Sequence, residues 1–158
     1  MSTNEKVVER FYAAFQKLDY QTMQDSYSET ASFTDPAFGT LFGSDIKDMW
    51  EMLCKNAKDF SLTFTSPISK DHHTVTCYWV ATYIFSKTGK QVENRVNATF
   101  KIQDGKITEH VDQFNFWKWS RQALGISGLL LGWTGFLHHK VNSTARLGLE
   151  NFKSKKNK

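Results

Sequence analysis

The spacing of hydrophobic positions changes from a helical to a strand period near residue 60. Upstream, apolar residues recur at intervals of three and four, which predicts an N-terminal helix that carries Val7 to Leu18 and a third helix that carries Ile46 to Cys54. Between them we expect a shorter helix through Met23 and Tyr27 and a short strand over residues 31–35. The glycine-punctuated segment 39–43 is predicted to be a packed loop.

Downstream of residue 60, apolar and polar residues alternate, which is the strand period. Strands are predicted over residues 60–65, 75–85 and 92–102, and the turn sequence Asp104–Gly105 leads into a fourth. Alternation along the fourth strand places Ile107, Glu109, Val111, Gln113 and Asn115 on one face and Thr108, His110, Asp112, Phe114 and Phe116 on the other. The element order predicts an α+β domain with helices on one face of a curved antiparallel sheet.

The segment after the sheet is predicted to form a C-terminal helical extension. We expect residues 3–120 to form the domain, residues 121–152 to form an arm that packs on the domain or on a partner subunit, and residues 153–158 to form a disordered basic tail. The less favoured alternative for the arm is membrane contact. Apolar residues that include Trp133 and Phe136, followed by lysines, are typical of an interfacial anchor.

Composition and charge narrow the classes of function. A chain of 158 residues with 40% hydrophobic content fits one globular domain. The net charge of +4 reflects four lysines within residues 153–158, so the body is close to neutral and we expect no nucleic-acid partner. Two isolated cysteines, Cys54 and Cys77, and a polar start without a secretory signal favour free thiols and a cytoplasmic location. No side chains stand at metal-ligand spacing, and we expect neither a metal nor another cofactor.

Asp112 is the strongest candidate for chemistry. An aromatic strand face disfavours the ionised carboxylate, which suits a general acid or base near neutral pH. The structural alternative is a carboxylate that accepts an indole N–H from Trp117 or Trp119, or that caps the following helix. His110 lies two residues away on the same face, where it could orient Asp112 or relay a proton. A half-exposed strand histidine is the alternative.

The element order and three segments resemble the nuclear-transport-factor-2-like superfamily in its SnoaL-like branch. The segments are Tyr27–Pro36, Gly43–Ile46 and Gly105–Asp112, and the resemblance covers roughly residues 5–120. This branch includes ketosteroid isomerases, limonene-epoxide-hydrolase-like enzymes and polyketide cyclases. The resemblance implies a cone-shaped barrel, in which the sheet wraps around the N-terminal helix and leaves an apolar pocket at its open end, and it implies a homodimer. Since one scaffold hosts many activities, it does not fix the chemistry.

The resemblance transfers two acidic positions and omits the other catalytic groups. Asp35, before Pro36, looks like the proton-shuttling base of the isomerases, although an acid before proline is also an ordinary turn starter. Asp112 looks like the acid/base of the epoxide hydrolases and SnoaL-like cyclases. The donor sets of both enzyme types are incomplete, because Phe11 and Ala98 replace the isomerase oxyanion donors and Trp79 and Ala81 replace the hydrolase arginine and aspartate.

The sequence therefore predicts a protein that binds a small hydrophobic or aromatic molecule. If it is an enzyme, we expect proton-transfer chemistry of the isomerase, cyclase or hydrolase type, with Asp112 as acid/base and Asp35 and His110 in support. The expected pocket lining is aromatic and comprises Trp50, Trp79, Tyr12, Tyr83, Phe114 and Phe116. The alternative is a non-catalytic ligand-binding or oligomerisation module of the same fold.

Overall fold

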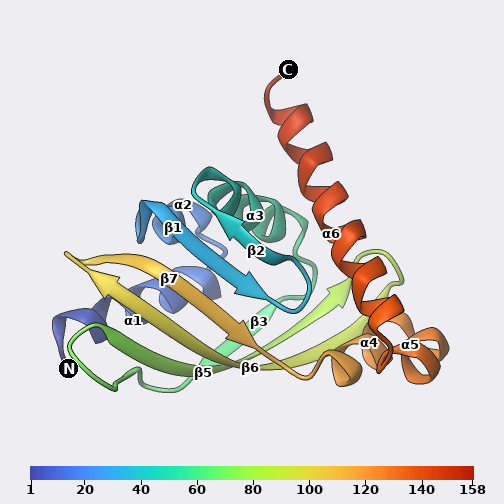
Figure 1. Cartoon of the computed structure of the whole chain (residues 1–158), viewed down its shortest axis with the longest axis horizontal. Coiled ribbons are helices and arrows are strands. Elements are labelled where there is room, and N and C mark those ends of the chain that lie inside the picture. The colour runs from blue at the N-terminus through green and yellow to red at the C-terminus, as the bar shows by residue number, and fades with distance from the viewer.

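A strongly curved sheet wraps around the N-terminal helix in the computed structural model, which describes residues 1–158 (Figure 1). The helices are α1 (Thr3–Gln16), α2 (Tyr20–Asp25), α3 (Ser44–Asn56), α4 (Phe116–Leu124), α5 (Ile126–Leu131) and α6 (Gly135–Lys156). The strands are β1 (Tyr27–Asp35), β2 (Gly39–Phe42), β3 (Ser61–Phe64), β4 (Ile68–Ser69), β5 (Thr74–Phe85), β6 (Lys90–Gln103) and β7 (Lys106–Gln113). The α+β cone expected from the sequence is confirmed.

The sheet contains more strands than the sequence pattern predicted. Its order is β2-β1-β7-β6-β5-β3, with β4 paired to β5, and all pairs are antiparallel except β1 with β7. Tyr27 begins β1 rather than ending a helix, because its strand pairs with β7 from Ile107 onward. The predicted loop 39–43 forms β2, whose hairpin with β1 closes at the Asp35 and Gly39 pair.

A β-bulge corrects the predicted face assignment of β7. Lys101 pairs with Glu109, but the next residue of β6, Ile102, pairs with Ile107, so Thr108 has no partner. The bulge turns Ile107 to the inner face, where it is fully buried like His110. The strand ends at Gln113, which places Phe116 in α4 instead.

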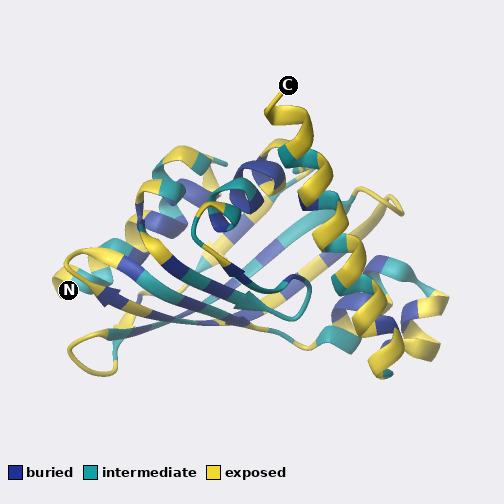
Figure 2. Ribbon diagram, turned by 45° about the horizontal axis from the view of Figure 1, so that its top comes forward, coloured by how far each residue is buried: buried dark blue, intermediate teal, exposed yellow.

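The hydrophobic core lies inside the curve of the sheet (Figure 2). Helix α1 begins with the predicted capping box, in which Ser2 and Glu5 exchange hydrogen bonds. Its buried face carries Val8, Phe11, Tyr12, Ala14 and Phe15, which pack against β5, β6 and helix α3. Phe11 of α1 makes edge-to-face contacts with Tyr27, Trp50 and Phe100, which hold α1 in one orientation relative to the sheet.

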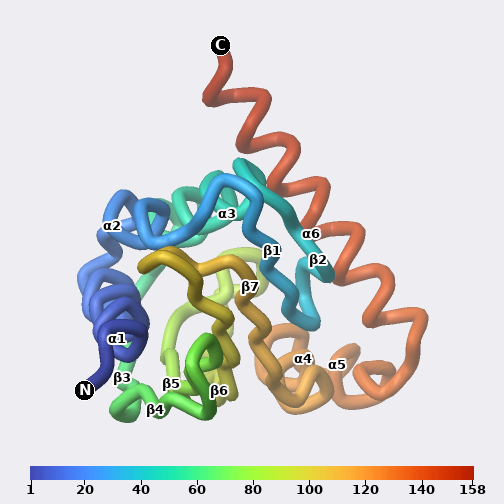
Figure 3. The backbone as a smooth tube through the Cα atoms, turned by 60° about the vertical axis from the view of Figure 1, so that its left-hand side comes forward, coloured from blue at the N-terminus to red at the C-terminus, as the bar shows by residue number.

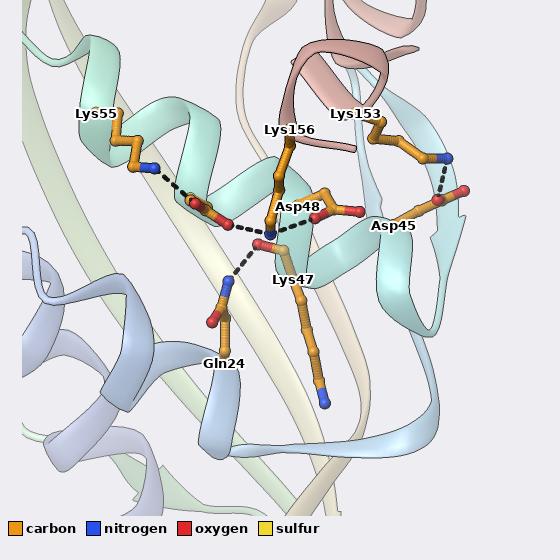
Figure 4. A network of polar contacts seen from close by, with 8 residues as sticks. Gln24, Asp45, Lys47, Asp48, Lys55, Lys153 and Lys156 are labelled. Carbon is orange, nitrogen blue, oxygen red and sulfur yellow. Dashed lines mark hydrogen bonds and ion pairs between the residues drawn. The ribbon is translucent and has the colours of Figure 1, made fainter. Parts of the chain in front are cut away.

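The C-terminal helix α6 crosses the open end of the cone and runs past β2 and α3 (Figure 3). It extends through Lys156, which differs from the disordered tail expected for residues 153–158. The reason is charge pairing with α3: Lys153 Nζ lies 2.7 Å from Asp45 Oδ1, and Lys156 pairs with both Asp48 and Glu51 (Figure 4). These partners lie more than a hundred residues apart in sequence, so no local pattern reveals them.

Polar contacts to the β1–β2 turn fix the middle of α6. Asn142 Nδ2 donates to the Ala37 carbonyl oxygen at 2.8 Å. Arg146 donates from Nε to the carbonyl of Phe38 and from Nη2 to that of Thr40, both at 2.9 Å. The arm therefore packs on its own domain. None of the helices combines the length and the apolar character that crossing a bilayer would require.

Candidate active site

A cavity of about 940 Å³ opens between the cone and helix α6. A cavity of this size accommodates a small organic molecule. Of its 34 lining residues, 21 are hydrophobic, so a bound molecule would lie mostly against apolar surface. Helix α6 contributes one wall through Leu137, Val141, Ala145 and Phe152. The arm thus encloses the open end of the cone as a lid would.

Four of the six aromatic residues predicted to line the pocket border this cavity, namely Trp50, Trp79, Tyr83 and Phe114. Tyr12 does not, because its ring is buried behind Trp79 at a centroid separation of 5.9 Å. Phe116 lies outside the cavity and stacks on His138, with ring centroids 4.3 Å apart. Whether the four bordering residues contact a ligand stays a prediction.

Two carboxylates face the cavity from neighbouring strands. Thr34 of β1 is in register with Val111 of β7, so Asp35 and Asp112 occupy the next position along the two parallel strands. Side chains alternate between the faces of a strand, and both carboxylates lie on the inner face, one residue beyond the paired Thr34 and Val111. Adjacent strands are about 4.8 Å apart, so each carboxylate lies within the electrostatic field of the other.

Asp35 serves both the turn and the cavity. Its Oδ1 accepts the backbone N–H of Phe38 at 2.6 Å, as a turn-starting acid would. Burial raises the pKa of Asp35 to about 7, the N–H of Phe38 opposes that rise, and the negative charge of Asp112 adds to it. A carboxyl group with this pKa is ready to exchange a proton near neutral pH.

Asp112 is the end of a chain of buried hydrogen bonds. Trp50 Nε1 donates to the Tyr27 hydroxyl at 3.0 Å, which leaves the Tyr27 proton free to donate to His110 Nδ1 at 2.6 Å. His110 then carries its own proton on Nε2, which lies 2.9 Å from Asp112 Oδ1. Each donor in the chain thus points toward Asp112, and the imidazole N–H holds one carboxylate oxygen in place.

Aromatic rings surround His110 and exclude water from it. Its side chain is 0% exposed, which rules out the half-exposed strand histidine considered above. Ring centroids of Phe100, Phe33 and Phe11 lie 4.1, 5.0 and 5.6 Å from that of His110. His110 does not border the cavity itself, so it can act on a ligand only through Asp112.

The structural alternatives for Asp112 do not occur. Trp119 Nε1 donates to the Tyr83 hydroxyl at 2.9 Å, and Trp117 Nε1 donates to the Leu129 carbonyl at 3.2 Å. Helix α4 is capped by Asn115, whose side chain accepts the N–H of Lys118. Asp112 is therefore tied to neither of these indoles nor to the helix start.

Two buried donors near the cavity have no hydrogen-bond partner, the Tyr12 hydroxyl and the Trp79 indole N–H. An unpaired buried polar group costs about 1–3 kcal/mol, and an acceptor atom that reached it would recover part of that cost. Trp79 borders the cavity, whereas Tyr12 does not.

Sequence reasoning missed Tyr27 as a member of the site. It lies 83 residues from His110, and only the parallel pairing of β1 with β7 brings the two side chains together. The family resemblance includes segment Tyr27–Pro36, in which Asp35 is the predicted site residue. The helical pattern instead predicts that Tyr27 ends a helix. No local pattern of residues signals this contact.

The side chains do not favour a metal site or a reactive thiol. No group of three or more His, Cys, Asp or Glu side chains is placed to hold a metal ion. Burial raises the pKa of Cys54 to about 12 and that of Cys77 to about 11, so both thiols stay protonated and are poor nucleophiles.

Solved structures share this fold at low sequence identity. An epoxide hydrolase of the limonene-epoxide-hydrolase-like type from M. tuberculosis has a TM-score of 0.66 and 19% identity over 82% of this chain and 96% of its own. TerC, co-crystallised with polyporic acid, has a TM-score of 0.67 and 17% identity over 78% and 100%. A candidate polyketide cyclase from Xanthomonas campestris pv. campestris has a TM-score of 0.64 and 16% identity over 77% and 96%. These likenesses establish the fold.

The sequence comparison with families is more specific. Among curated protein sequences, none matches the chain. The profile of the SnoaL-like domain, however, matches residues 8–110, from helix α1 to His110. This range covers more than half of the chain and includes Asp35, Tyr27 and the strands that position them. The chain belongs to the SnoaL-like domain family.

Proposed function

We propose that the cavity binds a small hydrophobic or aromatic molecule and that Asp35 and Asp112 catalyse proton transfer on it. The observation that carries this proposal is the placement of two carboxylates, from adjacent parallel strands, on one largely apolar cavity. Carboxylates that share a dry site divide the roles of acid and base, because the ionisation of one disfavours the ionisation of the other.

The surroundings of the two groups assign their roles. Asp112 accepts the N–H of His110 on one oxygen, which orients the carboxylate toward the ligand, and we assign it the role of base. Asp35, with its pKa of about 7, is protonated at lower pH and serves as the donor. Asp112 removes a proton from an acidic carbon of the ligand and returns it to another atom of the same molecule. Asp35 meanwhile donates a hydrogen bond to the oxygen on which negative charge develops.

The reaction types that fit are isomerisation, cyclisation and hydrolysis, which need only acids and bases from the protein. Solved relatives of the same fold include an epoxide hydrolase and a candidate polyketide cyclase. A ligand with a carbonyl group would use the Asp35 donor, and its apolar remainder would contact Trp50 and Phe114. A homodimer and a cytoplasmic location, expected above, stay predictions.

Deuterium exchange into 2-tetralone tests the proposal with a defined probe, because this aromatic ketone carries an acidic methylene group. In D2O, the wild-type protein should accelerate exchange over buffer, and the rate should fall as pH rises through about 7, where Asp35 loses its proton. Asp112→Asn should lower the rate by at least about 100-fold, which is typical for the loss of a general base.

Asp104→Asn is the matched control. Asp104 lies exposed in the β6–β7 turn at a positive φ of 51°, which asparagine also tolerates, so the rate should not change. Equal exchange by wild type and Asp112→Asn would contradict the proposal. If 2-tetralone displaces an apolar fluorescent dye from the cavity but no exchange is accelerated, the non-catalytic ligand-binding alternative is the correct one.

A further inference from the structure

Helix α5 turns its small residues toward the protein and its large apolar side chains toward solvent. It packs on α4 through glycines: a Cβ at Gly128 would lie 1.9 Å from the Ser120 carbonyl oxygen, and one at Gly132, just after the helix, 2.2 Å from Ser120 Oγ. The leucines between them point away from the protein, and Leu130 is 62% exposed. Helices of globular proteins bury their large apolar residues and expose polar ones, so this arrangement requires an apolar neighbour outside the chain.

The exposed apolar surface continues into the start of α6. Trp133 is 77% exposed and Phe136 is 72% exposed, more than any other aromatic side chain of the protein. We call the whole surface the arm patch; it comprises Ile126, Leu129, Leu130, Leu131, Trp133 and Phe136. In Figure 2, α5 lies at the lower right, and most of its ribbon has the colour of exposed residues. The patch lies at one end of the molecule, away from the sheet.

The charged residues of the segment that carries the arm patch have one sign. No acidic residue occurs between Asp112 and Glu150. Lys118, Arg121 and Lys140 are exposed in this interval, and the Arg121 guanidinium lies 4.7 Å from the Trp117 ring centroid, beside the base of α5. A segment that combines exposed Leu, Trp and Phe with cations and no acids is complementary to an anionic lipid headgroup layer, and the neighbouring acid on β6, Glu93, is paired with Arg95.

We propose that the arm patch docks on the surface of an anionic lipid bilayer. Trp133 and Phe136 insert at the interface, where amphipathic aromatic rings are favoured, and the neighbouring lysines and arginine contact the headgroups. A second copy of the chain is a poorer occupant, because a twofold contact through the patch would bring the same cations of both copies together. No helix is suited to span the bilayer, so the protein lies on its surface.

The patch also adjoins the cavity. Ser127 of α5 lines the cavity wall, together with Leu124 before this helix and Leu137 after it. An apolar ligand dissolved in the lipid could thus reach Asp35 and Asp112 without passing through bulk water. This last step rests on the proposed function, whereas docking itself does not, so Asp112→Asn should bind vesicles like the wild type.

Vesicle co-sedimentation of the full-length protein tests the docking. The wild type should pellet with vesicles of phosphatidylcholine and phosphatidylserine, and less with phosphatidylcholine alone or at high salt. Trp133→Ser with Phe136→Ser should lower the vesicle partition coefficient by about tenfold or more, because both anchors are lost. Vesicles should also shift the fluorescence of the wild type to the blue, since Trp133 is the most exposed tryptophan.

The matched control is Phe42→Ser with Leu147→Ser, two exposed apolar residues outside the patch, 65% and 61% exposed. This double variant should bind vesicles like the wild type. Circular dichroism checks that both double variants are folded. Failure of the folded wild type to bind either vesicle would overturn the inference, and so would equal binding by the Trp133 and Phe136 variant. Loss of a dimer in that variant, without any vesicle binding, would assign the patch to self-association instead.

Discussion

Helices α3 and α5 both carry large apolar side chains but place them on opposite sides relative to the protein. Helix α3 buries Ile46 and Met49 completely against the cone, whereas α5 buries a glycine and exposes three leucines. The cone, which contains α3, and the C-terminal arm, which contains α5, differ in the same way. The cone is held together by burial of many large side chains, whereas the C-terminal arm buries few, among them Leu137 and Leu149, and adds hydrogen bonds to turn carbonyls and ion pairs.

The cone therefore determines the stability of the protein, and the arm determines the access of a ligand to the cavity. Burial of large aromatic side chains contributes several kcal/mol per residue, but exposed ion pairs contribute about 0–1 kcal/mol each. The cone can therefore keep Asp35 and Asp112 in register while the arm opens locally at lower cost. Since α6 forms one wall of the cavity, its opening would admit a ligand.

The largest effect is expected in the cone, at Phe11. Its ring is fully buried and contacts the rings of Tyr12, Tyr27, Trp50 and Phe100 edge-on. Phe11→Ala should lower the free energy of unfolding by about 3–5 kcal/mol in chemical denaturation. Phe136→Ala, the same change in the arm patch, should alter it by less than about 0.5 kcal/mol. Similar losses would show that the arm is as tightly packed as the cone.

An intermediate effect is expected where the two regions meet, at Asp35. The pKa of Asp35 is about 7 in the folded protein and about 3.8 in the unfolded chain, so the folded state binds the proton more tightly. Asp35 therefore contributes stability that is fully present below about pH 4 and is lost as pH rises to about 7. Asp35→Asn lacks this loss and should exceed the wild type at pH 8 by an amount on the order of 2–4 kcal/mol.

Denaturation of both proteins at several pH values measures this difference. The slope between pH 4 and pH 7 should be shallower for Asp35→Asn than for the wild type, with Asp104→Asn as the exposed control. Identical slopes would mean that Asp35 is solvated as freely as a surface acid.

The smallest effect is expected at the ion pairs between the end of α6 and helix α3, which we call the C-terminal clamp. Lys153→Ala with Lys156→Ala removes the pairs with Asp45, Asp48 and Glu51, and Glu51 retains Lys55. The free energy of unfolding should fall by only about 1 kcal/mol. Hydrogen exchange should nevertheless quicken in α6 and stay unchanged in β5–β7. Lys155→Ala with Lys158→Ala removes two lysines that form no ion pair. Equal exchange in both double variants would argue against the clamp.

Local patterns in the sequence predicted most helices and strands, the family resemblance supplied the cone, and neither revealed the contacts between residues far apart in the chain. The periodicity around Phe11 and along β5, β6 and β7 predicted elements that the structure contains, because each side chain faces the core at a regular interval. The bulge at Thr108 was invisible, because a shift of register depends on the partner strand. The glycines at positions 39 and 43 predict a loop, whereas Gly39–Phe42 forms the four-residue strand β2, which is too short for its alternation to stand out.

The candidate site was predictable to the extent that it lies on one strand. His110 and Asp112 are two residues apart, so alternation alone placed them together. Asp35 came from the family resemblance, and its placement beside Asp112 requires the parallel pairing of β1 with β7. Tyr27 and the indole of Trp50 join through the folded core, which no spacing along the chain encodes.

All donors in the hydrogen-bond chain from Trp50 to Asp112 point toward Asp112, so the chain cannot carry a proton away from this carboxylate. His110 Nε2 already donates to the carboxylate, and His110 Nδ1 is occupied by the hydroxyl of Tyr27. Burial raises the pKa of Tyr27 well above its ordinary value, so that hydroxyl does not release its proton. A hydrogen captured by Asp112 has no route through the core to bulk solvent and must leave on the side from which it came. Exchange of that hydrogen with solvent therefore takes place through the cavity, and the access of water to the cavity sets how fast a deuteron from D2O replaces it.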